Sequence, residues 1–123
     1  MTKTVHNDVL DAALQYVEDN ADKLVICSTA PTTYTEANVT YALGSATPTF
    51  TGPVDGDTSG RKTTVDAVSG ATVDASGTYT HVALVDTANS KLLYVTEAGS
   101  SQAVTAGNQF SLAAWDVEIA DPV

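Results

Sequence analysis

The stretch KLVICST, residues 23–29, decides the fold of this chain. In an extended backbone, Leu24 and Ile26 point to one side of the pleat. Val25 and Cys27 point to the opposite side, so the segment is apolar on both faces. This pattern is typical of a strand in a sheet that is covered on two faces. The sequence therefore predicts a buried strand, with Cys27 inside the protein.

Residues 7–20, just before this strand, are predicted to form the one real helix. Apolar residues recur there at helical spacing, while acidic and polar residues occupy the other side. Asn7 is the expected N-cap, because an Asn side chain accepts hydrogen bonds from the free N–H groups of a first turn. We expect the apolar stripe to lie on the sheet; its members are Val9, Leu10, Ala13, Leu14, Tyr16 and Val17.

Downstream of the strand, turn residues and short extended segments alternate. Thr33 and Glu36 have the spacing of a capping box, which predicts a single helical turn that leads into a strand at residues 38–43. Residues 44–60 are rich in Gly, Pro, Thr and Asp. That composition predicts a long surface loop.

The segment after residue 60 has the pattern of an antiparallel meander. Turns are expected at Ser69–Gly70, at Ser76–Gly77 and at residues 87–90, so that each strand pairs with the next along the chain. At residues 113–115 the apolar positions change parity, which requires a bulge or a crossing between sheets.

These segments add up to about seven or eight strands, the number typical of a sandwich. We predict a mainly β fold, an antiparallel β-sandwich of jelly-roll or Ig-like type over residues 23–120, with one N-terminal α-helix. Because 123 residues suffice for one core, a single domain over residues 1–123 is expected.

Composition limits the classes of partner. Fifteen acidic and five basic residues give a formal net charge of −10. Such a surface repels nucleic acids and anionic membranes, so neither is predicted as a partner. The first residues lack the apolar core of a signal peptide, and no run approaches the about 20 apolar residues that span a bilayer. We therefore expect a soluble protein.

A thiol active site is one hypothesis for Cys27, the single cysteine. A catalytic cysteine needs a lowered pKa and a histidine base, and no local motif ties His6 or His81 to it. Free cysteine in an apolar strand is more often a core residue. The sequence thus indicates a scaffold role for Cys27, with no catalytic and no cofactor-binding residues. No second histidine stands at ligand spacing, so no metal site is predicted from the histidines.

The segment DGDTSGRKTTVD resembles a calcium loop. Its candidate ligands are Asp55, Asp57, Ser59 and Asp66, with Gly60 at the turn position. Two cations inside the segment and the absence of flanking helices favour an ordinary solvated turn, because Asp-Gly pairs are common in turns.

Arg61 and Lys62 are the only adjacent basic pair in this acidic chain. One interpretation is that they form ion pairs with nearby Asp residues. The alternative is that they contact an acidic patch on a partner protein. The first interpretation is favoured, since exposed ion pairs seldom have a further role.

Three segments carry a resemblance to a known family: ICSTAPTTYTEANVTYALG, SGRKTTVDAVSGATVDASGTYTHVALVD and SSQAVTAGNQFSLAAWDVEIADP. The chain resembles small proteins encoded in the structural gene regions of tailed bacteriophages and prophages. The resemblance implies a non-enzymatic virion protein without a cofactor, a head decoration or cement protein that binds the major capsid protein on the outside of the assembled head. Self-association, for example as a trimer, is also expected, with the protein in the host cytoplasm before assembly and on the virion afterwards.

Two other classes of function remain open. The same resemblance allows a tail, connector or baseplate component. A carbohydrate- or receptor-binding module is the other, with Tyr34, Tyr41 and Tyr94 as candidate sugar contacts, although aromatic residues on strands are more often core. An enzyme is the least favoured class, because no paired carboxylates, activated nucleophile or phosphate loop stand out.

Overall fold

The computed structural model describes residues 3–122. Within that range the chain forms one α-helix, one π-helix and nine strands, which confirms the predicted mainly β fold with an N-terminal helix and adds at least one strand to the expected number. The elements are α1 (Asn7–Asn20), β1 (Lys23–Cys27), η1 (Glu36–Thr40), β2 (Ala42–Ala46), β3 (Phe50–Asp55), β4 (Arg61–Val65), β5 (Val68–Thr72), β6 (Gly77–Asp86), β7 (Lys91–Val104), β8 (Gln109–Leu112) and β9 (Trp115–Ile119).

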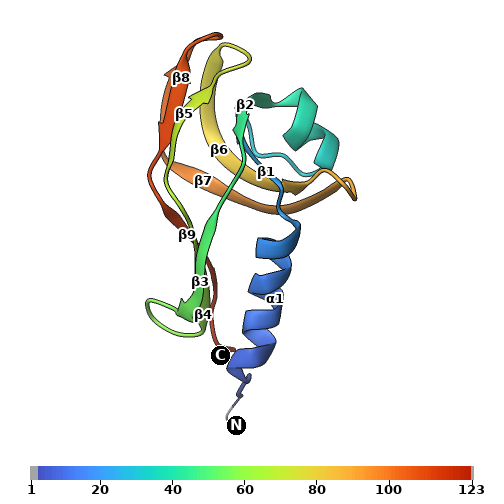
Figure 1. Cartoon of the computed structure of the whole chain (residues 1–123), viewed down its shortest axis with the longest axis vertical. Helices are drawn as coiled ribbons and strands as arrows, with labels where there is room; N and C mark the ends of the chain where they lie inside the picture. The colour runs from blue at the N-terminus through green and yellow to red at the C-terminus, as the bar shows by residue number, and fades with distance from the viewer. Residues whose placement is uncertain (1–2, 123) are drawn as a thin grey trace.

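The strands form three antiparallel sheets, ordered β2-β1-β6-β7, β3-β4-β9 and β5-β8. Figure 1 shows the four-stranded sheet and the β5-β8 pair in the upper half of an elongated molecule. In the lower half, α1 lies beside the three-stranded sheet and packs against β3 and β4. None of the helices in residues 3–122 has the length and the apolar character needed to cross a membrane.

Strand β1 has both faces covered, as its sequence predicts. Leu24 and Ile26 are fully buried in the main core, which also contains residues of β4, β6 and α1. Val25 and Cys27 are fully buried in a second, smaller cluster on the opposite face of the sheet. Ala37 of η1 belongs to this second cluster, so the segment around η1 is the cover that the apolar second face of β1 requires.

Helix α1 has the predicted bounds but not the predicted cap or orientation. His6, not Asn7, is the N-cap, and its Nδ1 accepts a hydrogen bond from the Asp8 backbone N–H at 3.0 Å. Leu10 and Leu14 are buried, as expected. The other edge of the predicted stripe, which includes Val9 and Tyr16, is exposed.

Polar contacts explain this rotation of the helix. The Asp11 carboxylate accepts a hydrogen bond from Arg61 Nε at 2.8 Å. The Glu18 carboxylate accepts one from the hydroxyl of the buried Thr63, also at 2.8 Å. Both carboxylates therefore face β4. As a result, the helix packs against the sheet through Leu10 and Leu14 and not through the whole apolar stripe.

The segment around Glu36 is helical as predicted, but it is a π-helix that extends further along the chain than the expected turn. The Thr33 hydroxyl accepts a hydrogen bond from the Glu36 N–H at 3.1 Å, as in a capping box. The Glu36 carboxylate accepts from the backbone N–H and the hydroxyl of Thr32, and these bonds lower the pKa of Glu36. Because the π-helix extends to Thr40, strand β2 begins at Ala42 rather than at residue 38.

The predicted loop at residues 44–60 is wrong. Strands β2 and β3 occupy much of it, and only residues 47–49 and 56–60 lie outside strands. Thr residues favour strands, and β3 gains ladder bonds from β4, so tertiary pairing overrides the Gly and Pro content. Hydroxyls of Thr49 and Thr51 also donate to the Asp66 carboxylate, which fixes the start of β3 next to the end of β4.

The expected hairpin at Ser69–Gly70 is also wrong. Both residues lie inside β5, where the register shifts between Val68 and Ala71 and Gly70 has a φ of +70°. Strand β5 pairs with β8, whereas β4 pairs with β3 and β9. No turn at Ser76–Gly77 joins paired strands either, because β5 and β6 belong to different sheets within the described chain.

Two further predictions are confirmed. Residues 87–90 form the turn of the β6-β7 hairpin. The change of parity at residues 113–115 marks a crossing between sheets, since β8 pairs with β5 and β9 pairs with β4. The crossing lets Phe110 and Val117 both reach the core, where each is at least nine-tenths buried.

Candidate functional site

Cys27 lies in a cross-strand row of three residues whose side chains could take part in catalysis. Cys27 stands opposite His81 in the β1-β6 register, and His81 stands opposite Glu97 in the β6-β7 register. Directly opposed residues project from the same face of a sheet. Sequence analysis missed this row, because strand pairing and not local spacing creates it.

The row does not have the electrostatics of a catalytic thiol. Cys27 is fully buried, its Sγ lies 3.7 Å from the Ala37 carbonyl oxygen and 3.9 Å from that of Val25, and burial raises the pKa of the thiol to about 11. The His81 ring is hydrogen bonded through Nδ1 to the Thr80 hydroxyl at 2.8 Å. Because a nucleophilic cysteine needs a lowered pKa, the geometry fits a core residue.

The four calcium candidates are not brought together. The Asp55 carboxylate pairs with Arg61 at 2.7 Å, and the Asp57 carboxylate pairs with Lys62 at 2.6 Å. The Ser59 hydroxyl accepts a hydrogen bond from a backbone N–H near the C-terminus, and Asp66 is bonded to threonine hydroxyls at the other end of β4. No group of three potential metal ligands occurs among residues 3–122.

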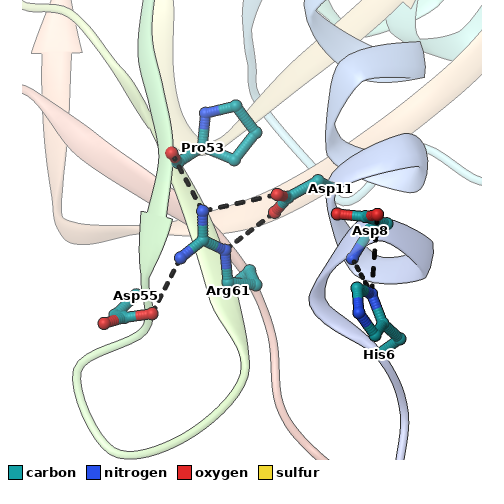
Figure 2. A network of polar contacts seen from close by, with 6 residues as sticks. All are labelled: His6, Asp8, Asp11, Pro53, Asp55 and Arg61. Atoms are coloured by element: carbon teal, nitrogen blue, oxygen red, sulfur yellow. Dashed lines mark hydrogen bonds and ion pairs between the residues drawn. The ribbon is translucent and has the colours of Figure 1, made fainter.

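Arg61 joins three segments of the chain. Figure 2 shows its guanidinium between Asp11 of α1 and Asp55 of β3, with a further hydrogen bond to the Pro53 carbonyl oxygen at 3.3 Å. Asp11, and then Asp55, raise the pKa of Arg61. The same view shows the separate His6–Asp8 contact at the start of α1.

Lys62 forms ion pairs on the opposite face of the same sheet. Its Nζ lies 2.6 Å from Asp57 and 3.2 Å from Asp116, and both carboxylates raise its pKa. Hydrogen bonds from Thr64 and then Lys62 lower the pKa of Asp116. The contacts of Arg61 and Lys62 thus match the internal ion-pair interpretation, and a partner contact by these two residues stays a prediction.

A cavity of about 450 Å³ opens between the middle of β7 and the crossing from β8 to β9. At this point β7 carries four residues between its partners of His81 and Tyr79, where β6 carries one, so β7 bulges away from β6. Trp115 lines the cavity and stacks on Tyr94, with ring centroids 5.9 Å apart. We regard this cavity as the candidate binding site.

No family model, no curated protein and no solved structure matches the chain.

The three tyrosines named as sugar contacts lie in different places. Tyr34 and Tyr41 are half-buried against the second core cluster, and the Tyr41 hydroxyl donates to Glu36 at 3.3 Å. Tyr94 lies near the cavity through its contact with Trp115. Sequence analysis did not single out Trp115 as a binding residue, although it is the only tryptophan and sits at the parity change.

Proposed function

We propose that this protein is a non-enzymatic structural component of a tailed-phage virion, a decoration protein that binds the outside of the assembled head. The resemblance of three long segments to phage structural proteins supports the virion assignment. The observation that carries the mode of action is an apolar strip on α1 that is exposed in the described chain, although Lys91 Nζ donates a hydrogen bond to the Tyr16 hydroxyl at 3.4 Å. A tail, connector or baseplate position is the alternative within the same class.

The strip occupies two turns of α1. Val9 is 63% exposed and Tyr16 is 45% exposed, and they lie seven residues apart on one side of the helix. Ala12 and Ala13 between them are exposed as well. Figure 1 shows strands along one side of α1 and open space along the other. Residues spaced i and i+7 on an open helix face are the anchors used in helix-in-groove recognition.

The remaining chemistry supports a structural role. The one thiol is buried, and its raised pKa disfavours the reactive thiolate. Arg61 and Lys62 are each bonded to two carboxylates. The net charge of −10 disfavours contact with packaged DNA and favours high solubility before assembly.

Binding to assembled heads rather than to free coat protein follows from geometry. A site on a shell spans several coat subunits, so its contacts exist together only after assembly. Self-association of this protein, for example as a trimer, would engage several such sites at once and multiply weak single contacts. The major capsid protein is the partner in this proposal, and the virion surface is the location.

The test is co-sedimentation of the purified protein with undecorated heads and, separately, with unassembled coat protein. Val9→Asp should weaken binding to heads about tenfold or more, since burying one valine is worth about 1.5 kcal/mol or more. Val39→Asp is the matched control, because Val39 is 67% exposed but lies on η1, away from the strip. Equal binding by both variants, or binding to free coat as tight as to heads, would contradict the proposal.

A further inference from the structure

The cavity beside β7 has the size and the mixed lining of a small-ligand site. Its volume of about 450 Å³ falls within the range of about 300–1,000 Å³ for such sites. Val82, Leu112 and Trp115 supply apolar walls, and Ser111 and Gln102 supply polar groups. The cavity is separate from the apolar strip of α1.

The polar lining is held in one orientation. The Tyr79 hydroxyl donates to Gln102 Oε1 at 3.0 Å. This bond fixes the amide and leaves its Nε2 with two hydrogen-bond donors. Within residues 3–122, Nε2 has no protein acceptor, and the hydroxyls of Ser100 and Ser111 have no bonded partner. Three polar groups at the cavity are therefore available to a ligand.

The aromatic wall contains one polar atom that its surroundings leave unsatisfied. Trp115 Nε1 is buried and has no hydrogen-bond partner, and it is the one such side-chain atom found in the described part of the chain. An unpaired buried donor costs about 1–3 kcal/mol.

The lining also restricts the charge of a ligand. No Lys or Arg lines the cavity, whereas Glu97 and Asp116 do. With a net charge of −10 on the whole chain, phosphate, sulfate and carboxylate ligands are disfavoured. A purely apolar ligand would cover the Gln102 amide without giving its Nε2 an acceptor. The remaining class combines an uncharged C–H face with several hydroxyl groups.

We propose that this cavity binds a neutral saccharide, with the apolar face of one sugar ring against Trp115 and its hydroxyls on Gln102 and Ser111. The site would give the protein a glycan-binding activity in addition to its structural role. It does not depend on attachment to a capsid.

The test uses the fluorescence of Trp115, the single tryptophan, in titrations of the whole protein. The probes are methyl glycosides of glucose, galactose, mannose and N-acetylglucosamine, with N-acetylneuraminic acid as the anionic comparison. At least one neutral glycoside should give a saturable change, and the anionic sugar should give none. Saturation by the anionic sugar alone, or by none of the five, would overturn the proposal.

Variants locate the site. Gln102→Glu keeps the acceptor for Tyr79 but removes the amide donors, and it should weaken binding at least tenfold. Ser111→Ala should also weaken binding. Gln15→Ala is the control, because Gln15 is an exposed helix residue bonded only to Asp19. Undiminished binding in both cavity variants, with melting temperatures unchanged, would refute the assignment of the cavity.

Discussion

Replacing Cys27 tests the claim that this protein has no reactive thiol. Cys27 is fully buried beside Ala37 and Val25. Cys27→Ala removes one buried sulfur and should lower the free energy of unfolding by about 1–2 kcal/mol. With a thiol pKa of about 11, about one molecule in a thousand carries a thiolate at pH 8, against about one in ten for a thiol with the ordinary pKa of 9.0.

The assay is labelling of the native protein with a thiol-reactive disulfide reagent at pH 8. The thiolate fraction alone predicts a rate about 100-fold below that of the unfolded chain, and burial lowers it further. Labelling of the native protein at the rate of a free thiol would refute the reasoning. Loss of head binding in Cys27→Ala, with the melting temperature unchanged, would also contradict a scaffold role.

The same group gives a pH dependence with a definite sign. The folded pKa of Cys27 is raised from 9.0 to about 11, so its contribution to stability is complete below pH 9. Between these values the unfolded chain releases the proton and the folded chain keeps it, so the contribution is lost as pH rises. Chemical denaturation at several alkaline pH values should show a shallower decline for Cys27→Ala than for the wild type. Parallel declines would contradict the raised pKa.

Three further predictions concern the stability of the fold and the absence of bound calcium. Gly60→Ala should destabilise the protein by about 2 kcal/mol or more, because Gly60 has a φ of +70° and an added Cβ would collide with the Ile119 carbonyl oxygen; an unchanged melting temperature would contradict this. Trp115→Ala should cost about 3 kcal/mol, the low end for a large aromatic residue, since the ring is half-buried on Tyr94; urea titration measures it. Calcium chelator should leave the melting temperature unchanged, because Asp57 is paired with Lys62; a calcium-dependent rise lost in Asp57→Asn would restore the calcium loop.

Local sequence patterns were sufficient to predict the elements that depend on neighbouring residues, and the strand that is apolar on both faces. The alternation at Leu24–Cys27 predicts a strand with two covers, and both core clusters are present. The turn at residues 87–90 joins adjacent strands, so its residues alone indicate the hairpin. The parity change at residues 113–115 predicts the crossing, because one strand cannot turn Phe110 and Val117 to the same core without it.

Non-local pairing is what the sequence could not predict. Strand β5 pairs with β8, about 40 residues later, and no local signal favours that partner over β4. Gly70 has the conformation of a turn residue but serves a bulge inside β5. The rotation of α1 depends on Arg61 and Thr63 of β4, which attract Asp11 and Glu18, so helical periodicity alone could not separate buried Leu10 from exposed Val9.

The candidate sites also differ in whether they depend on neighbouring residues or on segments far apart in the sequence. Internal pairing of Arg61 and Lys62 with Asp residues was the favoured interpretation of the sequence, and the observed ion pairs match it. The cavity at Trp115 depends on a bulge of β7 that faces the β8-β9 crossing, so two distant segments create it. Neither segment carries a binding motif, which is why the sequence did not indicate this site.

The most direct test of the central claim is a cryo-electron microscopy map of virions that carry the protein. We predict density for this fold on the outer surface of the head, in a fixed ratio to the major capsid protein, with the Val9–Tyr16 side of α1 against coat subunits. Density confined to the tail, connector or baseplate would replace the decoration proposal by the alternative. Absence of the protein from purified virions would contradict a structural role altogether.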